Sequence, residues 1–147
     1  MARFIRDNDY DALIRNEITG ILLENYNHDK MYKAEQMAIS QIKNYLKGKY
    51  DIEQIFTGHD PLLDPDPRSH YIVMITIDCT LYHLYTSTAP DRIPEHRAQR
   101  YGDALEWLKD VSRGDVAADL PLLTDDDGEV STSIRIKSKY TPSNHKY

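Results

Sequence analysis

The sequence of 147 residues has the length of a single domain, and its composition, 40% hydrophobic and 29% charged, suits a chain that buries one core. Acidic side chains outnumber basic ones by 24 to 18, and this charge of −6 argues against a protein that coats nucleic acid over its whole surface. The single cysteine, Cys79, excludes an internal disulfide and a multi-cysteine zinc site.

Four stretches have helical spacing. The first spans about residues 9–24, and the second spans about residues 30–47 and ends at Gly48. The predicted buried stripe of the second comprises Ala34, Met37, Ala38, Ile42, Tyr45 and Leu46. The fourth opens at Pro94, a favourable first-turn residue, and stops at Gly114. Its predicted stripe comprises Ala98, Tyr101, Ala104, Leu105, Leu108 and Val111, with Trp107 at the border.

The third stretch, about residues 69–86, is ambiguous by local pattern. Its first half has strand-like composition, but apolar residues occur at every phase instead of alternating, and its length favours a helix buried inside a bundle. A membrane span is disfavoured because Asp78 would lie at mid-membrane, at a cost of about 2.5–3.5 kcal/mol. The first residues also lack the apolar run of a signal peptide, so we expect a chain of the cytosol, or of a particle assembled there.

Two other segments carry turn and strand patterns. Between residues 51 and 69, three prolines within seven residues predict a long loop, because helix interiors and central strands do not tolerate them. The run from Asp125 to Gly128 predicts a turn, and the residues beyond it alternate as in a strand. We therefore predict a mainly α protein: a small four-helix bundle (residues 1–121) with a long Pro-rich loop, followed by a C-terminal β-hairpin or extended arm (residues 122–147).

No pattern of residues predicts an enzyme, a cofactor or a metal site. The six histidines have no ligand spacing, and we expect His83 to be structural and Cys79 to behave as a small apolar residue. Asp78 is expected to pair with Arg97 or Arg100, or to bond a tyrosine. A metal-dependent hydrolase that uses oxygen ligands of the loop is a third and disfavoured interpretation. Its residues would be His59, Asp60, Asp64 and Asp66.

Three motifs resemble a known family in their order and spacing. They are the run Ser40–Tyr50, the run Ile77–Leu84, and Ile93-Pro94 followed by residues 100–104, Trp107-Leu108 and Gly114. Together they cover roughly residues 5–121 and resemble the small head–tail connector proteins of tailed phages, the Mu-type group. The family usually has Arg-Tyr where Lys49-Tyr50 stands here, and the loop after it looks longer than usual.

The resemblance implies a structural virion protein. Such connectors form a ring, commonly twelvefold, beneath the portal protein, and they provide the docking surface for a tail or stopper protein. The implied partners are further copies of the chain, the portal and the tail or stopper, with DNA touched only through the ring lumen. The implied location is the head–tail interface of a virion assembled in the host cytoplasm. The alternative is a small cytosolic adaptor that binds one protein partner through a tyrosine-rich surface.

The net charge is unevenly distributed along the chain. Residues 130–147 contain four basic side chains and no acidic one, whereas the rest of the chain is strongly acidic. A basic arm on an acidic body favours head-to-tail self-assembly. The predicted contact residues of the arm are Val130, Thr132, Ile134, Arg135, Ile136, Lys137, Lys139 and Tyr140. The predicted acidic partner surface consists of Asp115, Asp119, Asp125, Asp126 and Asp127.

Overall fold

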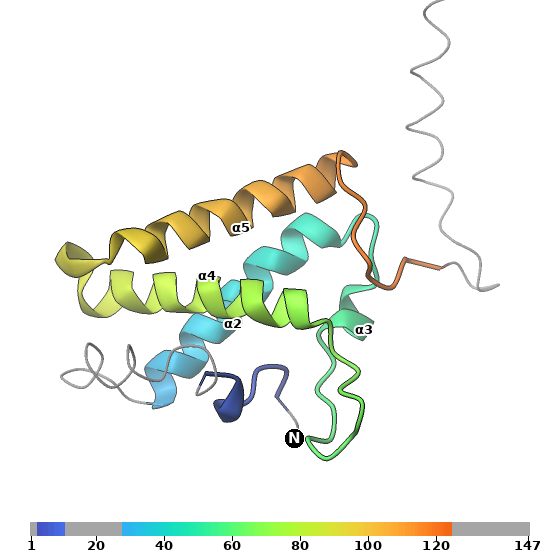
Figure 1. Ribbon diagram of the computed structural model, residues 1–147, viewed down its shortest axis with the longest axis horizontal. Coiled ribbons are helices and arrows are strands. Elements are labelled where there is room, and N and C mark those ends of the chain that lie inside the picture. Colours follow the sequence, from blue (N-terminus) through green and yellow to red (C-terminus); the bar gives the residue numbers. More distant parts are fainter. Residues whose placement is uncertain (1–2, 11–27, 125–147) are drawn as a thin grey trace, which may run out of the picture.

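The computed structural model describes residues 3–10 and 28–124, which form a mainly helical body, as predicted (Figure 1). The helices are α2 (His28–Leu46), α3 (Ile52–Ile55), α4 (His70–Thr88) and α5 (Glu95–Arg113), with a 3₁₀ turn η1 (Pro90–Arg92). Helices α4 and α5 run side by side in opposite directions, and α2 crosses both. Most of the predicted first helix and nearly all of the predicted arm lie outside the described residues, although residues 7–10 are helical.

Helix α4 is the central element of the body, and the prediction of a helix for this ambiguous segment is confirmed. It begins at the N-cap Ser69, whose side chain accepts a hydrogen bond from Ile72 N, and eleven of its 19 residues are buried. The hydroxyls of Thr76 and Thr80 donate to backbone carbonyls one turn earlier, each at 2.7 Å, so their polar groups are satisfied within the core. Within the described part of the chain, no helix is long and apolar enough to cross a membrane.

The predicted ends of α5 are confirmed, since Pro94 precedes it and Gly114 caps it in the left-handed conformation at φ 85°. Two residues that were predicted to lie in the buried stripes are exposed. Met37 is 57% exposed and Ala98 is exposed. Glu35 and Arg97 are buried instead, because each finds a charged partner inside the body.

The Pro-rich loop contains an element that the sequence pattern did not predict. Asp51 caps the one-turn helix α3 by accepting a hydrogen bond from Gln54 N at 3.2 Å, and Ile55 of α3 is buried against the core. The loop proper therefore runs from about residue 57 to residue 69, where it enters α4.

Candidate interaction surface

Arg68 holds the Pro-rich loop against the N-terminal segment. Its side chain is only 3% exposed and lies between two carboxylates, those of Asp66 and Asp9, with a closest contact of 2.7 Å to each. It also donates to the carbonyl oxygen of Phe4 at 2.7 Å. These charge-assisted bonds hold the pKa of Asp66 well below its usual range. One buried guanidinium thus joins the end of the loop to residues 4 and 9.

The tip of this loop presents two leucines to solvent. Leu62 is 88% exposed and Leu63 is 51% exposed. Asp60 shapes the turn: its carboxylate accepts from Leu62 N at 2.9 Å and its carbonyl accepts from Leu63 N at 3.1 Å, while Pro61 restricts the backbone between them. Residues 60–64, here termed the leucine tip, are therefore an ordered apolar projection. Covering one such side chain stabilises a contact by about 1.5–3 kcal/mol.

Two of the four loop residues considered for a metal site, Asp60 and Asp66, are engaged in other contacts. Asp66 is held by Arg68, and Asp60 bonds the backbone of its own turn. Among the residues that the structure describes, no group of three or more histidine, cysteine or acidic side chains is placed to hold a metal ion. Nothing in this part of the structure supports the hydrolase interpretation.

Asp78 joins α4 to α5 through both of the arginines expected from the sequence. Its Oδ1 lies 3.1 Å from Nη1 of Arg97 and 2.8 Å from Nε of Arg100, and Arg100 adds a second bond of 3.1 Å to Oδ2. Asp78 is 6% and Arg97 8% exposed, whereas Arg100 is 45% exposed. The predicted structural pairing of Asp78 is confirmed.

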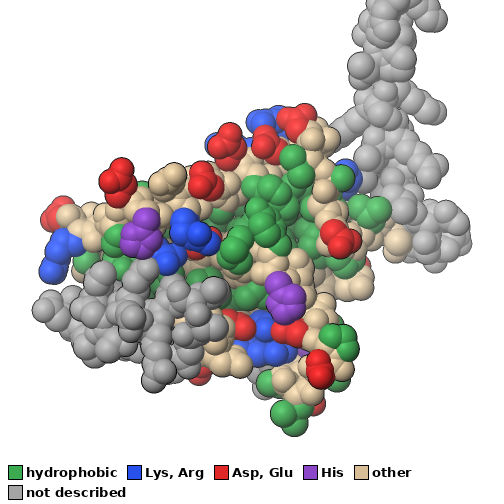
Figure 2. Space-filling view, in the orientation of Figure 1, with side chains coloured by type: hydrophobic (Ala, Val, Ile, Leu, Met, Phe, Trp, Pro, Cys, Tyr) green, Lys and Arg blue, Asp and Glu red, His purple; other side chains and the backbone are tan. Residues whose placement is uncertain are grey.

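A groove lies between α4 and α5 and consists of two hollows that share Tyr71. The larger, of about 360 Å³, is walled mainly by Tyr71, Trp107 and the segment of residues 117–120 after α5. The two rings meet edge to face with centroids 4.8 Å apart. The smaller hollow, of about 170 Å³, extends past Met74 to Arg100 and Asp103. Figure 2 shows this face, with apolar side chains gathered below a line of acidic ones along the edge formed by α5.

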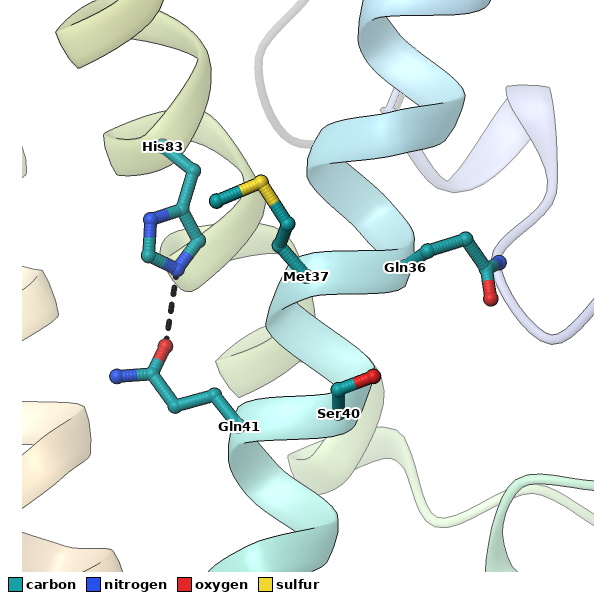
Figure 3. Close-up of a pocket in the computed structure, with 5 residues that line it drawn as sticks. All are labelled: Gln36, Met37, Ser40, Gln41 and His83. Atoms are coloured by element: carbon teal, nitrogen blue, oxygen red, sulfur yellow. Dashed lines mark hydrogen bonds between the residues drawn. The ribbon is translucent and has the colours of Figure 1, made fainter.

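A third hollow, of about 480 Å³, lies between α2 and α4 and contains His83 (Figure 3). His83 Nε2 and Gln41 Oε1 share a hydrogen bond of 2.9 Å, and Gln41 donates its amide to the hydroxyl of Tyr101 at 2.9 Å. Burial lowers the pKa of His83. The exposed Ser40 forms no bond to His83, so no nucleophile–base pair is assembled here. The network instead ties α2, α4 and α5 together, as expected of a structural histidine.

Cys79 is fully buried, and desolvation raises the pKa of its thiol to about 12. It remains a protonated, apolar side chain, in agreement with its sequence interpretation.

The N-terminal segment is fastened by a buried carboxylate that the sequence pattern did not reveal. Glu35 of α2 is 2% exposed and accepts hydrogen bonds from the hydroxyl of Tyr10 at 2.7 Å and from the guanidinium of Arg3 at 2.8 Å. Burial raises the pKa of Glu35 and that of Tyr10. Tyr10 and Arg3 lie 25 and 32 positions before Glu35 in sequence, so local spacing carried no signal for this cluster.

The start of the C-terminal arm is held against the body by the residue pair Lys49-Tyr50. Tyr50 is 1% exposed, forms an antiparallel bridge with Leu122, and accepts a hydrogen bond from Ala118 N at 3.1 Å through its hydroxyl. Backbone bonds of 2.9 Å from Asp51 N to Pro121 O and 3.0 Å from Leu123 N to Lys49 O flank the bridge. The chain therefore leaves the body beside α3 (Figure 1).

The predicted acidic surface is only partly described. Asp115 is exposed but bound by Arg113 at 3.2 Å, so its charge is compensated. Asp119 is exposed, forms no ion pair with any described residue, and lines the larger hollow of the groove. The remaining acids, Asp125–Asp127, and all eight predicted arm residues, from Val130 to Tyr140, lie outside the described residues.

These features define a small helical protein with apolar surfaces suited to contact with other proteins. Residues 1–134 match the model of the family described as Bacteriophage Mu, Gp36. The match covers most of the chain, so the chain belongs to this family of phage proteins. No curated protein and no solved structure matches it.

Proposed function

We propose that the chain is a structural virion protein that forms a ring between the portal and the tail or stopper, as a head–tail connector. The family match supports a phage structural or assembly role, and the resemblance of the motifs narrows it to the head–tail interface. The ring, commonly twelvefold in connectors of this kind, would be assembled in the host cytoplasm. Its partners would be copies of itself, the portal protein and a tail or stopper protein.

The observation that carries this proposal is the leucine tip. Two adjacent leucines, 88% and 51% exposed, form one apolar projection at this tip, and the buried ion pairs of Arg68 hold the end of the same loop against the body. A rigid apolar projection loses little conformational entropy when it docks, which favours a permanent contact. A projection that docks on a different surface of another subunit also suits head-to-tail contacts, which close a ring without a self-complementary patch.

A non-catalytic role agrees with the use of the polar side chains. Three described groups with the chemistry for catalysis are engaged in structure: Asp78 by two arginines, His83 by Gln41, and Asp66 by Arg68. We accordingly propose that the chain acts by binding and needs no cofactor.

The direct test is to locate the chain in phage particles. In the phage that encodes it, the full-length chain with a small affinity tag should copurify with mature particles at a fixed ratio to the portal protein. Chemical cross-linking should join it to the portal, and depletion of the chain should leave DNA-filled heads without attached tails. A chain that stays in the lysate, absent from particles and bound to one other protein, would instead establish the adaptor alternative.

A further inference from the structure

We propose that the groove between α4 and α5 is the docking site for residues 130–140 of the arm of a second copy of the chain. This inference rests on the proposed ring and names the contact between neighbouring subunits. It is carried by the chemistry of the groove and by the composition of the arm.

The groove combines an aromatic floor with free negative charge at its rim. Tyr71 is 46% exposed and lies edge to face against Trp107, so apolar surface remains accessible in the larger hollow. Asp119 borders this hollow and Asp103 borders the smaller one; both are exposed and make no ion pair with the described residues. Arg100, the basic residue that lines the smaller hollow, is bound to Asp78. An occupant should therefore be apolar on one side and basic on the other.

The arm has this composition in its sequence. Apolar or β-branched residues stand at 130, 132, 134 and 136, and basic residues stand at 135, 137 and 139, with no acid among residues 130–147. An extended segment of this pattern places the first set on one face and the second set on the other. The apolar face fits the Tyr71–Trp107 floor, and the long basic side chains reach the two carboxylates at the rim.

The proposed ring, together with the place where the described chain ends, gives each groove a candidate arm. Residues 117–120 form one wall of the larger hollow, and residues 121–123 are then held against residues 49–51 by the backbone bonds around Tyr50. The described chain ends beside α3, beyond the bundle and away from the face of α4 and α5 (Figure 1). In the proposed ring each groove has an adjacent copy that can supply a basic arm, and the tests below distinguish this contact from docking within one copy.

A charge-exchange experiment tests the pairing between copies. In the full-length chain, the groove variant D103K/D119K and the arm variant R135E/K137E/K139E each set like charges against each other. Each variant alone should sediment as a monomer at concentrations where the wild-type chain associates, and an equimolar mixture should associate again. The control variant E53K/E106K makes the same change in net charge as the groove variant at exposed positions outside the groove, and it should associate like the wild type.

Trp107 reports on the groove itself, since it is the single tryptophan of the chain. A synthetic peptide of residues 129–142 should change the Trp107 emission of the full-length arm variant, with an affinity that falls as salt increases. Adding D103K/D119K to the arm variant should weaken peptide binding by about tenfold or more, since two attractions become repulsions. Circular dichroism and thermal unfolding confirm that each variant is folded.

Three results would overturn the inference. The first is that the peptide has no effect on Trp107 emission, and the second is that the two variants remain monomeric when mixed. The third is a wild-type Trp107 signal that depends on the arm but not on chain concentration, which would show docking within one copy. The proposed function fails separately. A chain that passes these tests but is absent from particles would retain the contact between copies and lose the virion role.

Discussion

Two clusters of arginine and carboxylate groups use the same chemistry in opposite arrangements. At Asp78 one buried carboxylate lies between two arginines and joins α4 to α5, helices that also share an apolar core. At Arg68 one buried arginine lies between two carboxylates and joins a loop to the N-terminal segment. The first cluster adds to an interface that is already packed. The second takes the place of packing in a loop whose own apolar residues, Leu62 and Leu63, face solvent.

The difference shows that the surroundings of an ion pair decide how far its loss spreads. Asp78 and Arg97 are only 6% and 8% exposed, so the charge of Arg97 stays buried when the carboxylate is removed. Around Arg68, the partners Asp66 and Asp9 are 21% and 15% exposed and can be hydrated when the arginine is removed. We therefore expect global destabilisation from the first cluster and local loosening from the second.

The largest effect is expected from D78N. The change removes the carboxylate charge that faces Arg97, which is 8% exposed, and should lower the free energy of unfolding by about 3–5 kcal/mol. Urea denaturation followed by circular dichroism measures this. The exposed D103N, in the next turn of α5 after Arg100, should stay within about 0.5 kcal/mol of the wild type. Equal stability of D78N and the wild type would contradict the comparison.

The variant R68M keeps an unbranched apolar side chain and removes the guanidinium group that forms the ion pairs. We expect a smaller loss of stability, about 1–2 kcal/mol, together with faster amide hydrogen exchange in residues 57–68 but not in α4. The exposed R92M serves as the matched control and should change neither quantity. A uniform rise in exchange over the whole body would mean that Arg68 supports the core and that the two clusters do not differ as described.

Y50F removes one hydroxyl from the anchor of the arm. Because Ala118 N then loses its acceptor, the variant should be destabilised by about 1 kcal/mol, with faster exchange in residues 116–123. Y32F, at a tyrosine that is 49% exposed, is the matched control. Unchanged amide hydrogen exchange in residues 116–123 would show that the backbone bridge holds the start of the arm without the hydroxyl.

The smallest effect is a dependence on pH from His83. Since burial lowers the pKa of His83 in the folded chain, the unfolded chain takes up the proton first as the pH falls. The stability that neutral His83 contributes is present above the ordinary histidine pKa of about 6.5 and declines as the pH falls from there through the folded value. The difference in unfolding free energy between the wild type and H83Q should narrow over this interval, by less than about 1.4 kcal/mol per pH unit. A constant difference would contradict burial of the ring.

Local pattern predicted the helices well because their signals are local. Periodic apolar residues, Pro94 before α5 and Gly114 after it mark the elements within a few residues, and the length of the third stretch separated helix from strand. The predictions of buried residues failed where a partner distant in the sequence stabilises a charged side chain inside the core. Glu35 occupies the core because Arg3 and Tyr10 reach it, and no window of helical length contains all three residues.

The interaction surface was less accessible to sequence reasoning. Pairing of Asp78 with an arginine was predictable because a lone carboxylate in an apolar helix needs a counter-charge. Arg68 also had a signal that was not used, as the single arginine or lysine among the five acids of residues 51–69. The meeting of Tyr71 with Trp107 had no such signal, since it depends on how α4 and α5 pack.

The central claim is that the leucine tip serves assembly and not folding. The most direct measurement is the incorporation of L62S/L63S into phage particles, with its unfolding free energy determined in parallel. We predict stability within about 0.5 kcal/mol of the wild type, because both side chains face solvent, and loss of the chain from particles together with loss of attached tails. Normal incorporation of a stably folded L62S/L63S chain would contradict the claim.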